Sequence, residues 1–267
     1  MPVNDELGKR MKENYENIPK TKLMRRTPVA IRIDGKAFHT FTRGFDKPFD
    51  TVLVETMQET TKYLCQNIQG CVFGYTQSDE ITLILIDYQT LETSAWFDYE
   101  VQKMCSIAAS MATMAFNKEF ENKVEWFRIA NKLNGIEDAD TMEWNLYIKY
   151  LQAIEKGAMF DARCFNIPKE EVCNLIYWRQ VDAIRNSIQM CGQAYFSHSE
   201  LQGKRCSEIK DMLVNEKAFN WDELPAYLKR GSACVKSIDH GWIIDKLMPV
   251  LTGECRNYIN PRILYEE

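Results

Sequence analysis

A β-hairpin near residue 80 is the feature that most constrains the fold of this chain. Two runs rich in β-branched and apolar residues, Cys-Val-Phe-Gly-Tyr-Thr at 71–76 and Ile-Thr-Leu-Ile-Leu-Ile at 81–86, flank the polar tetrapeptide Gln-Ser-Asp-Glu at 77–80. Runs of this kind around a short polar turn predict two antiparallel strands. The turn then presents Asp79 and Glu80 at one edge of a sheet.

The segments on either side of the hairpin supply the other elements of a mixed domain. Residues 28–33 form a β-branched run that ends at Asp34-Gly35, which predicts a strand followed by a sharp turn. Residues 160–165 resemble a further strand. Helices are expected over 4–18, over 51–68 after an N-cap at Asp50 or Thr51, over 94–117, and from Pro168 to about 194.

This order of elements predicts an α+β fold. It is a split βαβ (βαββαβ) antiparallel sheet like that of polymerase palms, with helices on one face. The charged, helical stretch 118–157, which includes the acidic segment 137–140, is interpreted as an insertion into a domain that spans 1–237. The tail 238–267 has no assigned role. Nucleotide cyclases and RNA-recognition domains share this topology, so the fold alone does not decide between catalysis and binding.

Composition narrows the class of protein. A chain of 267 residues with 45% hydrophobic residues can bury a large core in one compact domain. It has no run of about 18 apolar residues and no signal peptide at its start, so we expect a soluble, cytoplasmic protein. The net charge of −5 argues against a polycation that coats nucleic acid, although basic residues gather at 9–26 and 229–230. Nine cysteines without a C-x-x-C pair predict buried thiols rather than a zinc site.

Two aspartates carry the chemistry that the predicted sheet suggests. In a split βαβ sheet the first strand lies beside the hairpin, so Asp34 and Asp79 can reach one point. Two such carboxylates repel each other unless a cation lies between them, and Mg²⁺ prefers oxygen ligands. Lys36, His39 and Lys47 are nearby cations suited to a triphosphate. The alternative is that Asp34-Gly35 and the hairpin tip are ordinary turns.

Five short motifs occur in a fixed order along the chain. They are Arg-Ile-Asp-Gly-Lys-Ala-Phe-His at 32–39, Lys-Pro-Phe-Asp at 47–50, Gln-Ser-Asp-Glu at 77–80, Tyr-Trp-Arg-Gln-Val-Asp at 177–182 and Leu-Pro-Ala-Tyr-Leu-Lys-Arg-Gly at 224–231. In this order they resemble the motifs of the tRNA-His guanylyltransferase family. The resemblance covers about residues 3 to 235.

The resemblance implies a palm-like nucleotidyltransferase that adds nucleotides, G in particular, to the 5′ end of tRNA under the guidance of a template. In the family, a 5′-monophosphate is first activated with ATP or GTP, and the 3′-hydroxyl of the incoming nucleotide then attacks the activated phosphate. It also implies two Mg²⁺ ions per active site, the tRNA acceptor stem as a partner, and a homotetramer built as a dimer of dimers.

The resemblance further implies roles for individual residues. Asp34, Asp79 and the Gly35 carbonyl match the family's metal ligands, and Glu80 matches the neighbouring catalytic acid. Residues that match nucleotide-binding segments are Lys36, Ala37, Phe38, His39 and Ser78, and those that match the loop for the activating nucleotide are Lys47 and Asp50. Residues that match a segment for phosphates and the tRNA end are Arg179, Gln180, Asp182 and Asn186, while Trp178 is as compatible with the core.

One departure from the family pattern bears on the substrate. Members dedicated to tRNA-His carry His-Ile-Asn-Asn just after the Trp-Arg-Gln segment, whereas this chain has Ile-Arg-Asn-Ser at 184–187. The sequence here is more similar to the guanylyltransferase-like branch, which implies repair of 5′-truncated tRNAs rather than strict G addition to tRNA-His. Two other readings stay open: an RNA-binding module without turnover, and a palm-domain nucleotide cyclase.

Overall fold

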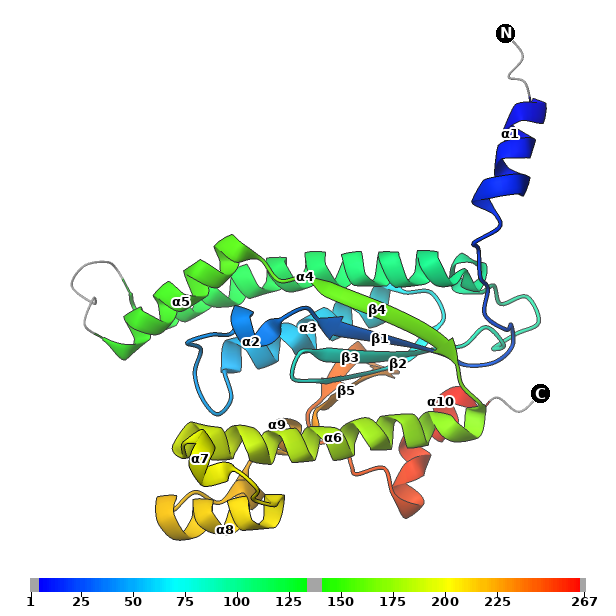
Figure 1. The fold of residues 1–267 in the computed structure, drawn as a ribbon. Helices are drawn as coiled ribbons and strands as arrows, with labels where there is room; N and C mark the ends of the chain where they lie inside the picture. The colour runs from blue at the N-terminus through cyan, green and yellow to red at the C-terminus, as the bar shows by residue number, and fades with distance from the viewer. Residues whose placement is uncertain (1–4, 134–140, 265–267) are drawn as a thin grey trace.

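One antiparallel sheet of six strands organises the molecule, for which we analysed a computed structural model that describes residues 5–133 and 141–264 (Figure 1). The strands are β1 (Val29–Gly35), β2 (Cys71–Gln77), β3 (Glu80–Leu85), β4 (Phe160–Asn166), β5 (Ser232–Ser237) and β6 (Gly241–Asp245). Their order across the sheet is β4-β1-β3-β2-β5-β6. The predicted βαββαβ unit is therefore confirmed, and β5 and β6 extend it beyond β2.

Apolar and charged side chains alternate along the second half of β1, so they lie on opposite faces of the sheet. Val29, Ile31 and Ile33 are buried on one face against α3 (Thr51–Asn67) and α4 (Val101–Ala130). Because successive side chains of a strand point to opposite faces, Arg32 and Asp34 lie on the other face. The two helices of the βαββαβ unit thus cover one face, as the sequence predicts. Asp50 is the N-cap of α3, also as predicted, and accepts a hydrogen bond from Leu53 N.

The second face of the sheet is partly covered by α6 (Lys169–Tyr195). Ile176 on α6, Ala30 on β1 and Phe73 on β2 belong to one buried cluster on this face. The segment after β5, to which the sequence assigned no role, contributes to the same cluster through Ile259 and through Ile263 of α10 (Asn260–Ile263). The structure therefore packs the C-terminal segment into the core.

The expected insertion at 118–157 does not begin as a separate unit. Residues 118–130 continue α4, whose Phe120 and Val124 are buried in the main core, and α5 (Met142–Lys156) then packs back on α4. The acidic segment 137–140 lies outside the described residues. Most of the described part of the stretch is helical, as predicted, but residues 118–130 belong to the helix that supports the sheet.

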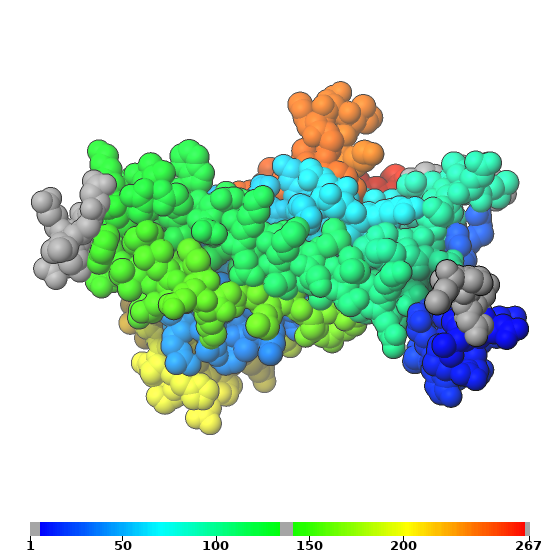
Figure 2. Space-filling view, turned by 90° about the horizontal axis from the view of Figure 1, so that it is seen from above, coloured from blue at the N-terminus to red at the C-terminus, as the bar shows by residue number. Residues whose placement is uncertain are grey.

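Short helices flank one end of the sheet. They are α2 (Phe38–Phe41), α7 (His198–Leu201), α8 (Cys206–Lys217) and α9 (Ala226–Arg230). A separate buried cluster, which includes Ile188 of α6, Leu213 of α8 and Trp221, fastens α8 to α6. In the view onto α4, the α7–α8 region (yellow) and the β5–β6 region (orange) stand out from the body (Figure 2).

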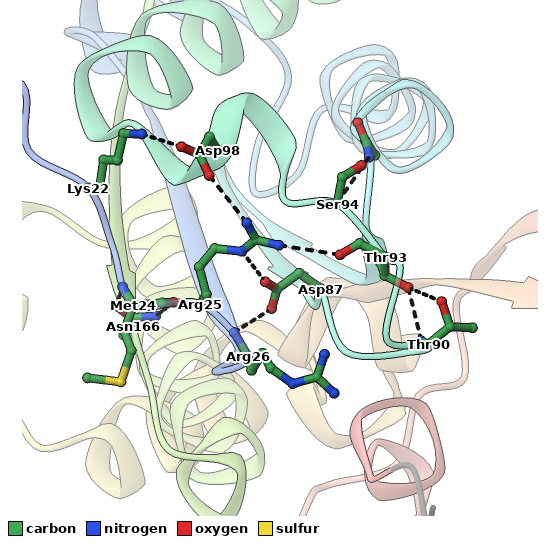
Figure 3. Close-up of polar contacts among 11 residues, drawn as sticks. Lys22, Met24, Arg25, Arg26, Asp87, Thr90, Thr93, Ser94, Asp98 and Asn166 are labelled. Atoms are coloured by element: carbon green, nitrogen blue, oxygen red, sulfur yellow. Dashed lines mark hydrogen bonds and ion pairs between the residues drawn. The ribbon is translucent and has the colours of Figure 1, made fainter.

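The N-terminal helix α1 (Asp5–Met11) and the π-helical turn after it (Lys12–Glu16) project away from the body (Figure 1). The segment that follows is anchored by ion pairs to the loop between β3 and α4 (Figure 3). Asp87, fully buried, accepts from Arg25 Nε at 2.6 Å and from Arg26 N at 2.8 Å. Asp98 pairs with both Lys22 and Arg25. These contacts hold the chain where it enters β1.

None of the helices within the described ranges combines the length and apolarity that crossing a bilayer requires.

Candidate active site

Three carboxylates form a row across the end of the sheet, on the face that α6 covers in part. Asp34 lies opposite Glu80 of β3 on one side and opposite Asp161 of β4 on the other. Directly opposed residues of antiparallel strands point to the same face with Cβ atoms about 5 Å apart. The sequence predicted Asp34 and Glu80 as neighbours but missed Asp161, which only the pairing of β4 with β1 brings there.

Asp79 lies at the tip of the β2–β3 turn, next to this row. The Gly35 N–H donates to the Asp79 carbonyl at 3.1 Å, which ties the turn to the end of β1. Ser78, in the left-handed region with φ of 51°, donates from Oγ to Asp79 Oδ1 at 3.0 Å. The structure thus brings Asp34, Gly35, Ser78, Asp79 and Glu80 together, as the sequence motifs predict.

The surroundings of Asp34 and Asp79 disfavour the charged form of both carboxyl groups. Burial, chiefly, raises the pKa of Asp79 to about 6, and the charges of Asp34 and Glu80 add to the effect. The pKa of Asp34 is also raised, first by burial and then by Glu80 and Asp161. A cation bound between such carboxylates would relieve the repulsion. Among the residues that the structure describes, no three His, Cys, Asp or Glu side chains are arranged so that together they could hold a metal ion.

Glu80 is held by two arginines. Arg179 on α6 pairs with Glu80 Oε2 and, at 2.9 Å, with Asp182 Oδ2, and Arg32 Nη2 lies 3.4 Å from Glu80 Oε2. The Arg179 side chain is only 4% exposed, and its Nε has no hydrogen-bond partner among the residues the structure describes. Arg179 and Asp182, expected to contact phosphates, therefore form an ion-pair network that fixes the orientation of Glu80.

A further arginine, unremarked in the sequence, approaches the row from the edge strand β4. Arg163 Nη2 lies 3.3 Å from Asp161 Oδ1 and 4.0 Å from Asp34 Oδ2, and its side chain is 55% exposed. Arg163 also lies opposite Arg32 in the β1–β4 register. The acidic row is thus followed, two residues further along the strands, by a pair of arginines.

The loop after β1 divides into exposed and buried residues. Lys36, Ala37 and His39 are exposed, and the Lys36 N–H donates to the Met159 carbonyl at 2.8 Å. Phe38 is buried among Phe41, Phe116 and Phe160. A nucleotide at this loop would meet the backbone of Phe38 rather than its ring.

Gly35 is required by the same packing. A Cβ on Gly35 would overlap the ring of Phe38. In the Asp-Gly pair of the motif, Asp34 thus supplies the carboxylate, and Gly35 leaves space for the buried ring of Phe38.

The second loop of the predicted site also has two kinds of residue. Lys47 is exposed. Asp50 is buried, and its carboxylate accepts from Asp46 N, Leu53 N and the Tyr150 hydroxyl at 3.1, 2.9 and 2.7 Å. Burial raises the pKa of Asp50, while these hydrogen bonds oppose the rise. Asp50 thus supports the loop by capping α3, and Lys47 is the member of the pair that solvent reaches.

A cavity opens beside Ser78, between α3, the end of β2, α6 and the 227–232 segment. Ser78, Asp50 and Asn186 line it together with apolar side chains that include Phe49, Leu53 and Met190. Gln180 lies elsewhere: its side chain is buried, donating to the Pro249 carbonyl at 2.9 Å and accepting from Leu251 N at 3.0 Å. Asn186 is thus beside the candidate site, whereas Gln180 anchors the C-terminal segment.

A sheet of this topology with a row of carboxylates at its end is typical of palm-like domains that act on nucleotides. The family model described as tRNAHis guanylyltransferase matches residues 8–168. The chain belongs to this family of nucleotidyltransferases, which confirms the resemblance noted in the sequence.

Known relatives agree with this placement. A bacterial tRNA(His) guanylyltransferase (Thg1)-like protein, solved in complex with ATP, is 38% identical with a TM-score of 0.80, covering 97% of this chain and all of that one. A bacterial protein of the same description in complex with GTP is 35% identical with a TM-score of 0.77, covering 98% of this chain and all of its own. The tRNA(His) guanylyltransferase of Debaryomyces hansenii is 24% identical over 80% of this chain and 75% of its own length. The palm-like fold is confirmed.

Proposed function

We propose that the protein extends the 5′ end of tRNA in a template-dependent, Mg²⁺-dependent reaction, and that its substrates are 5′-truncated tRNAs rather than tRNA-His alone. The observation that carries the proposal is the grouping of Asp34, Asp79 and Glu80 at one end of the central strands, with Glu80 oriented by Arg179 and Arg32. A protein that only binds RNA has no need to concentrate carboxylates beside a polyanion.

Nucleoside triphosphates are the proposed co-substrates. Relatives that share the whole fold have been solved with ATP and with GTP. In this chain the exposed basic residues Lys36, His39 and Lys47 follow the end of β1, where they suit a triphosphate. We assign Lys47 to the nucleotide that activates the 5′-monophosphate, because the resemblance to the family implies this role for the loop that Lys47 and Asp50 share.

The donor set fits Mg²⁺. Asp34, Asp79 and the Gly35 carbonyl are all oxygen donors. Besides burial, the charge of Glu80 raises the pKa of both aspartates and the charge of Asp34 raises that of Asp79, a repulsion that a divalent cation would remove. Mg²⁺ keeps several waters and shares phosphate oxygens, so a sparse set of protein ligands suffices. When bound, a pair of such ions would activate the attacking 3′-hydroxyl and neutralise the leaving phosphate.

The chain's own residues prepare the site for this chemistry. Arg179 and Arg32 hold the Glu80 carboxylate in one orientation, and the Gly35–Asp79 backbone bond fixes the turn against β1. All of these contacts are made between residues of the protein itself, and groups that are fixed in this way need little rearrangement during a reaction. The tRNA acceptor end would approach the exposed edge of this row.

Repair is favoured over strict G addition by two observations. Residues 184–187 lack the His-Ile-Asn-Asn pattern of the dedicated enzymes. Identity is also higher to the bacterial guanylyltransferase-like protein, at 38%, than to the fungal tRNA-His enzyme, at 24%. A tetrameric assembly and a cytoplasmic location are part of the same proposal.

The test uses two 5′-monophosphorylated RNAs, a full-length tRNA-His and another tRNA that lacks its first nucleotide. Purified protein is incubated with Mg²⁺, ATP and all four nucleoside triphosphates, and extension of the 5′ end is measured. We expect extension of the truncated tRNA by the templated base. Addition of G confined to tRNA-His would contradict the repair proposal, and extension of neither would contradict both.

A further inference from the structure

Trp178 is exposed beside the active site. The sequence left open a place in the core, yet the residue is 52% exposed on α6, whereas Ile176 and Arg179 around it are buried. An aromatic ring of this size left in solvent loses the burial energy that a core position would supply. Because Trp178 lies beside the acidic row, a substrate that binds there could cover its ring.

Two guanidinium groups lie close to this ring. The Cζ atoms of Arg179 and Arg32 are 4.7 and 5.3 Å from its centroid, within the range of cation–π attraction. Their side chains are only 4% and 18% exposed, so they support the ring from within the protein. The exposed half of Trp178 then faces outward as a platform whose orientation is fixed by the two arginines.

The platform is connected to the reacting end of the sheet. Arg32, under the ring, lies 3.4 Å from Glu80, and Arg32 and Asp34 point to the same face of β1. Arg163, opposite Arg32 on the edge strand, and Arg185, two turns along α6 from Trp178, have side chains that are 55% and 64% exposed. In each of their ion pairs with aspartates the arginine side chain is solvent-exposed, so the pairing is weak and leaves them able to exchange to phosphates.

We propose that Trp178 stacks on a nucleobase of the terminal base pair of the tRNA acceptor stem, with Arg163 and Arg185 contacting the flanking phosphates. The inference rests on the proposed function. Stacking suits this position because every base has an aromatic face, so one platform serves RNAs that end in different nucleotides. Repair of truncated tRNAs requires that tolerance.

The test compares variants of Trp178 with a matched control. Trp126 on α4, the helix on the other face of the sheet, is 68% exposed and serves as the control site. We expect Trp178→Leu to weaken tRNA binding by roughly fivefold to a hundredfold, the range of one stacked base, and to leave the KM for ATP unchanged. Trp178→Phe, which retains a ring, is expected to recover most of the affinity, and Trp126→Leu to match the wild type.

An RNA with an abasic nucleotide at either position of the terminal pair locates the contact. If Trp178 stacks on one of these bases, removing that base weakens wild-type binding but adds little to the loss in Trp178→Leu. Fully additive losses at both positions would overturn the proposal. So would unchanged tRNA binding together with a shift of Trp178→Leu in size-exclusion chromatography, which would make the ring a subunit contact. Failure of 5′ extension by the wild type, with tRNA binding and its Trp178 dependence intact, would overturn the proposed function alone.

Discussion

The Tyr150 hydroxyl donates a hydrogen bond of 2.7 Å to Asp50 Oδ2, across 100 residues of sequence. Asp50 caps α3 and ends the loop that carries Lys47, so this buried hydrogen bond connects α5 to the candidate site, and the Tyr150 ring also packs against Phe45 of the same loop. The helical stretch 118–157, whose role the sequence left open, thus supports the nucleotide loop.

Replacing Tyr150 by Phe should loosen this loop. The buried Asp50 carboxylate loses one of its donors, which we expect to lower the free energy of unfolding by about 1–2 kcal/mol. Urea unfolding measures the loss. Tyr147→Phe, one turn earlier on α5, is the control, and an equal loss in both variants would show that the Asp50 contact is not the cause.

Replacing Arg179 by Met should affect both stability and catalysis. The change leaves Glu80 and Asp182 without their shared cation, and breaking a largely buried pair costs about 3 kcal/mol. We expect a large fall in kcat for nucleotide addition, because Glu80 loses its orientation. Arg185→Met removes an exposed cation from the same Asp182 and should cost less than about 1 kcal/mol in urea unfolding. Full activity of Arg179→Met would refute the positioning role.

Binding of Mg²⁺ should depend on pH through Asp79. Its pKa is raised to about 6, so below that pH the carboxyl carries a proton that a metal ion must displace. Affinity should therefore rise as the pH increases through about 6 and level off above it. Isothermal titration of the apo-protein with Mg²⁺ at several pH values measures this. In Asp79→Asn binding should be much weaker without that rise, and nucleotide addition should be abolished while tRNA affinity is kept.

Lys47→Ala should separate the two chemical steps. We expect extension of a 5′-monophosphorylated tRNA to fall more than extension of a 5′-triphosphorylated one, because only the first requires the activating nucleotide. Single-turnover rates on the two RNAs give the comparison. Arg43→Ala removes an exposed cation four positions earlier and should leave their ratio unchanged. Equal losses on both RNAs in Lys47→Ala would exclude the activation role.

Gly35→Ala should destabilise the fold at the site itself. The added methyl group overlaps the Phe38 ring, and overpacking of this kind costs about 1–3 kcal/mol. The double variant Gly35→Ala with Phe38→Leu should lose less than the sum of the two single changes, since the smaller side chain makes room. Additive losses in thermal unfolding would place the strain elsewhere.

Local patterns predicted four of the six strands and placed Asp34, Asp79 and Glu80 at their ends. The first strand, the hairpin, the strand at 160–165 and the N-cap at Asp50 are read from residues close together in sequence, and the structure agrees. The charged residues after 117 suggest that the long helix ends there, but the helix continues to Ala130. Phe116, Phe120 and Val124 nevertheless continue its apolar stripe, and this spacing could have extended it.

What the sequence missed depends on contacts between distant segments. Asp161 and Arg163 join the site only because β4 pairs with β1 in one register. The family resemblance implied that Arg179 contacts phosphates, whereas its burial and its pairing with Glu80 follow from how α6 lies on the sheet. Strands β5 and β6 are short, and their pairing beside β2 has no local signal.

The alternation along β1 ties the chemistry of this enzyme to its core. Ile31 and Ile33 point to one face because they are apolar, and Arg32 and Asp34 must then point to the other. A slip of one residue in the pairing of β1 would bury Asp34 under α3 and expose Ile33 to substrate. Substitutions at the buried apolar positions of β1 should therefore reduce activity as well as stability. Selection should remove such substitutions even though these side chains never contact a nucleotide.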